Sequence, residues 1–194
     1  MADIDFLDRV FHSARTYANW LDKAVSPELL SQVYDLVKMA PTSVNCMPAR
    51  FVFLSSPEAK ARLLPALVAA NVEKARAAPV TVIVASDTRF YERIPHLFHH
   101  RPEAMQPFVD NAELAETTAF RNSTLQGGYF ILAARAVGLD CGPMSGFDHA
   151  MVDAEFFADG RLRSNFLVNL GYGDESMSFP RLPRLSVDEA CTFL

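Results

Sequence analysis

Cysteine is scarce in this chain. Its 194 residues include only three cysteines, Cys46, Cys141 and Cys191, and these are widely spaced. Three distant cysteines do not form a disulfide framework, so the sequence favours a reducing compartment and predicts a cytoplasmic location. Cys46 and Cys141 are each expected to be a buried thiol that packs as a small hydrophobic group.

Basic clusters and long apolar runs are also missing. The formal net charge is −5 and no run of Lys or Arg occurs, which argues against a nucleic-acid partner and against an anionic membrane surface. No apolar stretch reaches the roughly 18–20 residues that a membrane-spanning helix needs. Residues 1–10 carry acids in place of the basic segment that begins a signal peptide. We therefore expect no nucleic-acid partner and no membrane partner.

Apolar residues make up half of the chain, and residues 1–194 are expected to form one compact domain with a sizeable core. Helices and strands are interleaved without a regular βαβ rhythm, and G-x-G-x-x-G is absent, which predicts an α+β fold without a Rossmann site. Pro65 is expected to interrupt its helix. Apolar periodicity predicts helices at 4–13, 27–39, 57–69, 71–77, 111–137 and 152–157, and strands at 50–54, 80–85 and 165–170.

A polar loop between a helix and a strand is the most informative segment. Pro41 ends the helix, and Pro48 stiffens the far side of the loop. Thr42, Ser43 and Asn45 lie between the two prolines, and their short hydroxyl and amide groups suit a flat ligand rich in heteroatoms. An ordinary helix-to-strand connection made of turn-forming residues is the alternative interpretation.

A second loop follows the longest predicted helix. Gly138 is expected to terminate that helix at its C′ position. Residues 138–147, Gly-Leu-Asp-Cys-Gly-Pro-Met-Ser-Gly-Phe, then form a short strand or loop. The helix itself contains a cluster of small residues between Gly127 and Ala134, which would let another helix approach closely.

The two loops together resemble those of the nitroreductase family, the FMN-dependent oxidoreductases. The family's P-[ST]-S-x-N-x-x-P loop is similar to residues 41–48, and its later P-x-x-G-F loop is similar to residues 143–147. The resemblance extends from about Arg15 to Arg184. Within the family, two segments look closest to one branch, the malonic semialdehyde reductases (3-hydroxypropanoate dehydrogenases) of pyrimidine utilisation. These segments are Asn-Cys-x-Pro-Ala-Arg-Phe-Val-Phe and Leu-Asp-Cys-Gly-Pro-Met-Ser-Gly-Phe-Asp.

The resemblance implies a nitroreductase-like fold, with a mixed, mostly antiparallel sheet flanked by helices. It also implies an intertwined homodimer with non-covalent FMN at two interface sites and NAD(P)H as the reductant. Hydride would move through flavin N5, so no catalytic side chain is expected. The long helix at 111–137 suits the dimer axis, although the central helix of a monomer would show the same pattern.

The resemblance assigns the FMN phosphate to basic residues near the N-terminus. Arg15, followed by Thr16 and Tyr17, matches an Arg-x-Ser type motif in degraded form, because Ala18-Asn19 stands where many relatives have a second basic residue. The forked donors of arginine suit a phosphate. A surface position is the alternative interpretation of Arg15.

Residues near the C-terminus also resemble a phosphate-binding element of the family. The segment 179–184, Phe-Pro-Arg-Leu-Pro-Arg, is similar to a basic pair that closes over the phosphate. Arg184 is the favoured member of this pair, and Arg181 is the second candidate. The prolines stiffen the segment, which a solvated terminus would not need.

The flavin ring is expected to contact both loops and one further helix. Ser145 stands where many relatives have glutamate, which leaves the backbone N–H of Gly146 as the expected N5 partner. Lys74 lies one helical turn from Asn71 and would stabilise the anionic reduced flavin; a solvated lysine is the alternative. The residues that match the family are Pro41, Thr42, Ser43 and Asn45 (from the second subunit), Asn71, Lys74, Pro143, Met144, Ser145 and Gly146.

The branch implies that the substrate is malonic semialdehyde, which is reduced to 3-hydroxypropanoate. A substrate carboxylate needs a cation over the flavin, and the candidates are Arg89, Arg93, Arg101 and Arg121. Two other functions stay open: a broad nitroaromatic or quinone reductase, and a flavin-binding module without turnover. In such a module, residues 86–110 would form a permanent cap.

Residues 86–110 form an aromatic and basic excursion with three prolines, which predicts a loop or loose helices of the kind that serve as lids. His96, His99 and His100 could share one helical face and bind a metal. Prolines interrupt the region, however, and no nearby cysteine completes a ligand set. We therefore expect no metal site.

Overall fold

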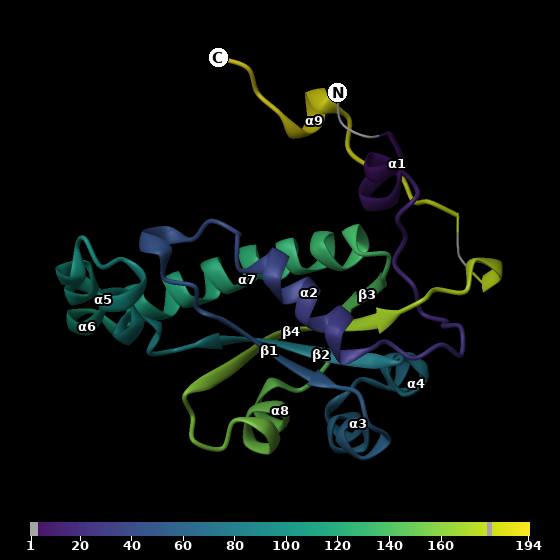
Figure 1. Ribbon diagram of the computed structural model, residues 1–194, viewed down its shortest axis with the longest axis horizontal. Helices are drawn as coiled ribbons and strands as arrows, with labels where there is room; N and C mark the ends of the chain where they lie inside the picture. Colours follow the sequence, from purple (N-terminus) through teal and green to yellow (C-terminus); the bar gives the residue numbers. More distant parts are fainter. Residues whose placement is uncertain (1–3, 178–179) are drawn as a thin grey trace.

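The computed structural model describes residues 4–177 and 180–194, and it is built around one four-stranded sheet (Figure 1). The strands, in the spatial order β1-β2-β4-β3, are β1 (Ala49–Leu54), β2 (Val80–Asp87), β3 (Asp140–Met144) and β4 (Leu162–Gly171). All three neighbouring pairs are antiparallel, and Thr16 adds an isolated parallel bridge to Cys141. The predicted α+β fold with a mostly antiparallel sheet is therefore confirmed.

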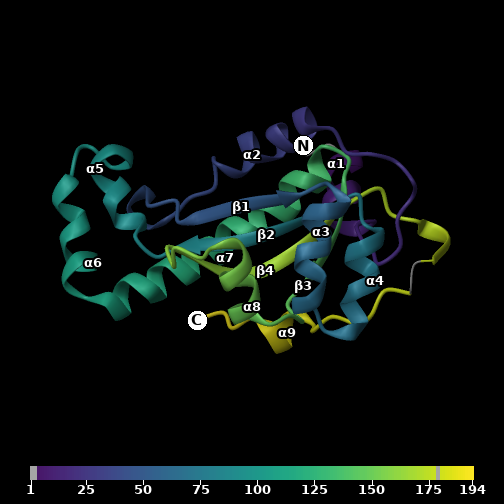
Figure 2. The same cartoon turned by 90° about the horizontal axis from the view of Figure 1, so that it is seen from below.

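Helices cover both faces of this sheet (Figures 1 and 2). One face carries α2 (Pro27–Val37) and α7 (Ala112–Ala136), and the other carries α3 (Pro57–Leu63), α4 (Ala69–Ala77) and α8 (His149–Phe156). All eight residues of β2 are buried because this strand lies between the two helical layers. Successive side chains of β2 point to opposite faces of the sheet, so Val82 joins the core under α7 while Ile83 joins the core on the other face.

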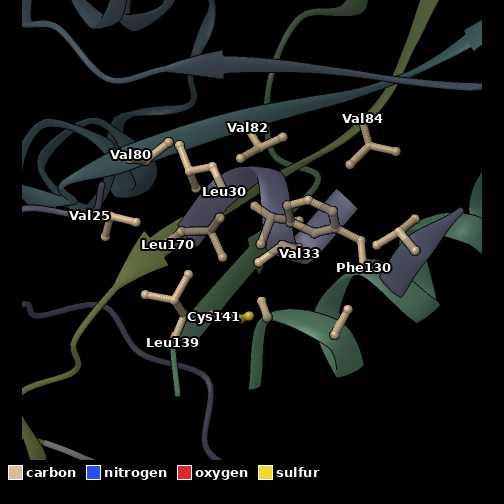
Figure 3. Packing of buried hydrophobic residues seen from close by; sticks show 14 residues of the cluster. Val25, Leu30, Val33, Val80, Val82, Val84, Phe130, Leu139, Cys141 and Leu170 are labelled. Carbon is tan, nitrogen blue, oxygen red and sulfur yellow. The ribbon is translucent and has the colours of Figure 1, made fainter. Parts of the chain in front are cut away.

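Phe130 lies at the centre of the larger core. Its ring stacks on Phe51 of β1 with 5.0 Å between ring centroids, and it is completely buried. Figure 3 shows it directed from α7 toward the valines of β2, with Val33 of α2 close by. One aromatic side chain thus joins helix α7, helix α2 and the sheet.

Local capping explains where the helices begin. Ser26 Oγ accepts from Leu29 N at 3.2 Å, and Ser56 Oγ accepts from Ala59 N at 3.1 Å, each one residue before a proline that starts the helix. Asp148 caps α8, which therefore starts at His149 and not at the predicted residue 152.

Proline and glycine account for two of the breaks along the chain. The predicted helix 57–69 is divided, as expected, because Pro65 lies in a short 3-10 helix, η3 (Leu64–Ala66), between α3 and α4. Gly138 has φ +88°, a conformation that glycine adopts readily, and it ends α7 as predicted.

The long helix α7 exposes several of its large apolar residues. Leu114, Phe120, Leu125 and Tyr129 are exposed, whereas alanines and buried polar residues face the protein. Gly127 does not receive another helix: a Cβ there would lie 2.4 Å from the ring of Phe166, on β4. The small residue therefore admits the sheet of the same chain, which corrects the predicted helix contact at this position.

The excursion at 86–110 consists of four short helices beyond one end of the sheet. They are η4 (Phe90–Arg93), α5 (Ile94–Leu97), η5 (Pro102–Met105) and α6 (Gln106–Asp110). Phe90 and Ile94 are fully buried and form a small core with Cys46 and two alanines of α7. The excursion therefore packs against the polar loop that contains Cys46.

The remaining short helices lie near the two ends of the chain or within the polar loop. They are α1 (Ile4–Leu7), η1 (Asp8–His12), η2 (Ser43–Asn45), η6 (Glu175–Met177) and α9 (Val187–Ala190). The last segment extends away from the sheet (Figure 1). No helix in the described ranges is long and apolar enough to cross a membrane.

Replacing Phe130 by alanine tests the packing of the larger core. Deleting this buried ring should lower the free energy of unfolding by about 3–5 kcal/mol, because the transfer energy of the ring and the cost of a cavity add. Urea unfolding followed by circular dichroism measures the change. Phe6→Ala, at a half-exposed ring, is the control and should change the free energy by less than about 1 kcal/mol.

Candidate functional site

The polar loop after α2 has an unusual backbone. Val44, Asn45 and Met47 have φ values of +46°, +50° and +41°, and they are the non-glycine residues with positive φ in the described part of the chain. A β-branched residue such as Val44 is rarely found in this region. Each such residue costs on the order of 1–3 kcal/mol and persists only where surrounding contacts hold it.

Three hydrogen bonds fix the shape of this loop. Met47 N donates to Thr42 Oγ1 at 3.2 Å within the loop. Ser43 N donates to Asn122 Oδ1 of α7 at 2.9 Å, and the Asn45 side-chain amide donates to the carbonyl of Leu97 in α5 at 2.8 Å. The Ser43 side chain is exposed, so its hydroxyl faces outward from a rigid support.

The second motif meets the helix that carries Asn71 and Lys74. Gly146 O accepts from the Asn71 amide at 3.1 Å and from Val68 N at 3.1 Å. Lys74 Nζ in turn donates to Asn71 Oδ1 at 3.3 Å. A Cβ on Gly146 would lie 2.8 Å from Asn71, so glycine permits this approach. The structure thus brings together three of the predicted residues, and both bonds to Gly146 use its carbonyl and not its N–H.

The rest of the second motif leads into this cluster. Pro143 and Met144 are the last residues of β3, where they pair with Val168 and Leu167 of β4. Ser145 follows the strand and is exposed. The edge strand β3 therefore places Ser145 and Gly146 beside the start of α4.

Residues 15–17 lie at the other end of β3. Thr16 pairs with Cys141, and Tyr17 N donates to Cys141 O at 3.0 Å. Two glycines make room for this segment: a Cβ on Gly142 would lie 2.3 Å from the Tyr17 carbonyl, and one on Gly173 would lie 2.2 Å from the Tyr17 ring. The ring is buried, and burial raises the pKa of its hydroxyl. Backbone pairing and close packing therefore fix the position of the segment that carries Arg15.

Four arginines line a cavity of about 310 Å³ beside this segment: Arg15, Arg135, Arg181 and Arg184. The described residues around the cavity include no Asp or Glu. Four guanidinium groups around one cavity would attract an anion such as a phosphate. The predicted residues Arg15, Arg181 and Arg184 thus share one cavity, whereas Phe179 of the same motif lies outside the described residues.

Hydrogen bonds to main-chain carbonyls hold Arg135, Arg181 and Arg184 in place. Arg135 donates to Val10 O at 3.2 Å and to Arg15 O at 3.4 Å. Arg181 donates to Ala14 O at 3.0 Å, which ties the C-terminal segment to the N-terminal one. Arg184 donates to the nearby carbonyl of Leu182 at 2.9 Å.

One chain does not bring the polar loop to the other predicted residues. Ser43 is bonded to residue 122 of α7, and Arg15 is bonded to residue 135 of the same helix. The difference, 135 − 122, is 13 residues, and at 1.5 Å per residue it places the two anchors about 20 Å apart. Figure 1 shows the polar loop and the N-terminal segment near opposite ends of α7. Pro41, Thr42, Ser43 and Asn45 are therefore separated from the remaining predicted residues.

The candidate cations for a substrate carboxylate do not form one group. Arg89 lies 3.7 Å from Glu92 and lines a cavity of about 710 Å³ beside α7, while Arg93 lines a different cavity of about 490 Å³ along β1. Arg101 pairs with Glu103 at 3.6 Å, and Arg121 lies on the exposed side of α7. Among the described residues, no three His, Cys, Asp or Glu side chains are grouped so that they could hold a metal.

Two contributors to the site were not identified from the sequence. Arg135 lies in the last turn of α7, and Asn122 is a buried polar residue on the inner face of that helix. Gln126 belongs to the same inner row and accepts from Ala49 N at 3.0 Å. Polar residues on the core-facing side of a predicted helix indicate such contacts in a sequence, because buried polar groups require hydrogen-bond partners.

The cysteines in the two motif loops are buried, as expected. Burial raises the pKa of the Cys46 thiol to about 11 and that of the Cys141 thiol to about 12. Cys191 is exposed near the C-terminus. The two loop cysteines are therefore protonated packing groups and not nucleophiles.

An aromatic disulfide reagent tests this assignment at pH 8. Less than about one part in a hundred of the Cys46 and Cys141 thiols should be ionised at that pH, so only Cys191 should react rapidly. Cys191→Ser should abolish the rapid phase, and denaturant should restore reaction at the two buried thiols. Rapid labelling of Cys46 or Cys141 in the folded protein would contradict their burial.

Sequence comparison matches residues 12–172 to the family model described as Nitroreductase family. A protein from Burkholderia lata is 61% identical over 183 residues, which cover 94% of this chain and 93% of that protein. HadB from Ralstonia pickettii is 55% identical over 188 residues, with 96% of each chain covered. Both proteins carry the provisional name NADH dehydrogenase/NAD(P)H nitroreductase.

Solved structures give the same result for the fold. A provisionally assigned nitroreductase from Exiguobacterium sibiricum, in complex with FMN, has a TM-score of 0.87 at 22% identity and covers 100% of this chain and 99% of its own. The ydfN protein of Bacillus subtilis has a TM-score of 0.86 at 20% identity and covers 99% and 100%. At such low identity these similarities establish the fold alone.

Proposed function

The chain belongs to the nitroreductase family, and on that premise we propose that it is a single-domain, FMN-dependent NAD(P)H oxidoreductase that works as a homodimer. The observation that carries the proposal is the arrangement along edge strand β3. The arginine cavity lies beside its first residues, and the Asn71–Lys74–Gly146 cluster lies beyond its last ones. From Cys141 to Gly146 the chain spans roughly 16 Å at strand geometry.

The residues at the first end of β3 suit the phosphate of FMN. Arg15, Arg181 and Arg184 supply guanidinium groups, and Arg135 adds a fourth cation that the family resemblance did not predict. Thr16 and Tyr17 hold Arg15 beside the strand through Cys141. Guanidinium groups can bind phosphate oxygens in pairs, so this cavity would fix the anionic end of the cofactor.

The residues at the second end suit the polar edge of the flavin ring. The Asn71 amide is oriented by Gly146 O, and Lys74 is held beside it. An ammonium group here favours negative charge on the reduced ring, and the N–H of Gly146 would serve N5. Bound there, FMN would supply the redox chemistry that links NAD(P)H to a substrate. The chain therefore binds and orients, and no side chain needs to act as a nucleophile.

The polar loop would complete the site from the second chain. In one chain the loop and helix α4, which carries Asn71 and Lys74, lie toward opposite ends of the sheet (Figures 1 and 2), which supports this role. The exposed Ser43 hydroxyl and the Thr42 hydroxyl are available donors on a rigid loop. Exposed Leu114, Leu125 and Tyr129 lie on one side of α7 and give the two chains an apolar face to bury.

Leu125→Asp tests the dimer. A charge on the exposed apolar side of α7 should shift the protein to a monomer, because burying an unpaired carboxylate is costly. Light scattering should then give about half of the wild-type mass, and FMN binding should be lost with the second chain's loop. Met151→Asp, at a similarly exposed residue of α8, adds the same charge on the opposite face of the sheet and should leave the mass unchanged.

We propose malonic semialdehyde as the substrate, reduced to 3-hydroxypropanoate, on the wording of the two motif loops. Arg89 and Arg163 line the cavity of about 710 Å³ beside α7, and either guanidinium group would suit a substrate carboxylate. Ser145 places no acid beside the ring, so an anionic substrate would not be repelled there. Three free cysteines and a nicotinamide donor fit a cytoplasmic enzyme.

A broad nitroaromatic reductase is the second candidate function, and the names of the relatives from Burkholderia lata and Ralstonia pickettii favour it. Turnover with malonic semialdehyde and with a nitrofuran at equal concentration separates the two. A kcat/KM at least about tenfold higher for the aldehyde supports the first proposal. The opposite order assigns the protein as a nitroreductase.

The absorbance spectrum of the purified protein tests the shared part of both functions. Flavin bands should be present or should return on addition of FMN, and anaerobic NADH or NADPH should bleach them. Lys74→Met should leave the protein folded but slow the bleaching, because it removes the cation beside the ring. Bands that neither nucleotide bleaches would instead identify a flavin-binding module.

A further inference from the structure

We propose that Arg50 is a positioning residue that holds the strained polar loop in its flavin-binding shape, with Asp87 as its anchor. This inference rests on the proposed function, since it gives the loop a ligand. Arg50 lies in β1, directly after the polar loop, and Asp87 is the last residue of β2. Neither residue is among the polar residues of the two motif loops.

Asp87 is the buried centre of an ionic network. Its side chain is 2% exposed. It accepts from Arg50 Nη2 at 2.7 Å, from Arg161 Nε at 3.0 Å and Nη2 at 3.1 Å, and from the backbone N–H of Arg89 at 3.0 Å. Arg161 also pairs with Glu92 of the excursion at 3.0 Å. One carboxylate thus joins β1, the excursion and the turn before β4.

Arg50 is the member of the network that contacts the loop. Its Nη1 donates to Met47 O at 2.9 Å and to Ala49 O at 2.8 Å, while its Nη2 is held by Asp87. The backbone N–H of Asp87 donates to Pro48 O at 2.8 Å. Three consecutive carbonyls at the end of the loop, those of residues 47 to 49, are therefore fixed by Arg50 and Asp87.

The strained backbone of the loop needs these contacts to keep its conformation. Val44, Asn45 and Met47 stay at positive φ only while contacts on both sides of the loop hold them. Asn122 and Leu97 hold the first side, and Arg50 holds the second. Released from Arg50, residues 44–47 would relax toward ordinary backbone conformations, and Ser43 and Asn45 would leave the geometry that a flavin requires.

Arg161 provides an internal control because it shares the anchor but not the loop. Its guanidinium is bonded to Asp87 and Glu92, and within the part of the chain that the structure describes it makes no hydrogen bond to residues 41–49. A network that only stabilises the fold would respond in the same way to loss of either arginine. A positioning role predicts that only Arg50 matters to the loop.

The experiment compares Arg50→Lys with Arg161→Lys. Lysine keeps the charge but lacks the planar fork that reaches two carbonyls and Asp87 at once. In FMN-free protein, amide hydrogen exchange of residues 45–47 should become about tenfold faster in Arg50→Lys and change by less than about twofold in Arg161→Lys. FMN titration followed by flavin fluorescence should show the same contrast, with a dissociation constant about tenfold higher in Arg50→Lys alone.

A third variant, Arg62→Lys, controls for the substitution itself, because Arg62 pairs with Glu155 on the exposed surface away from the loop. Equal effects of Arg50→Lys and Arg161→Lys would overturn the proposal, and so would wild-type exchange of residues 45–47 in Arg50→Lys. The exchange experiment contains no FMN. A wild-type protein that fails to bind FMN would therefore refute the proposed function, while the exchange data would still decide the role of Arg50.

Discussion

The length of helix α7 sets the layout of the whole site, because this one rigid element fixes the distance between its two halves. The polar loop is bonded to the middle of the helix through Asn122, and the arginine cavity is bonded to its last turn through Arg135. A helix does not shorten to bring such points together. The polar loop and helix α4, which carries Asn71 and Lys74, also lie toward opposite ends of the sheet (Figures 1 and 2), so one FMN that contacts both would take them from two chains. The exposed apolar residues of α7 offer the surface on which those chains would meet.

The two halves are built by different means. Along β3, glycines at 142, 146 and 173 let other segments approach the edge of the sheet so closely that no Cβ would fit. In the polar loop, by contrast, strained backbone is held by side chains that come from α7, α5 and β1. Both arrangements fix backbone groups before any ligand arrives, which reduces the entropy that binding must overcome.

Local chemistry in the sequence was sufficient to predict much of this fold. Ser26-Pro27 and Ser56-Pro57 begin helices as expected, Pro65 divides one and Gly138 ends another, because each acts on its own backbone. The motifs also led to the arginine cavity and to the contact between Asn71 and Gly146. Arg135, Asn122 and the Arg50–Asp87 pair were not predicted, since their partners are far away in the sequence. For α7, the pattern suited both a dimer axis and the central helix of a monomer, because periodicity alone does not say which apolar side is covered by the same chain.

Mixed dimers would test the division of the site between two chains most directly. Arg15→Ala would damage the phosphate end of one chain, and Ser43→Trp would block the loop of the other; neither homodimer should bind FMN well. Co-expression should produce heterodimers in which one of the two sites is intact, so FMN binding should recover to about a quarter of the wild-type value per chain. No recovery in verified heterodimers would show that each site is built within a single chain.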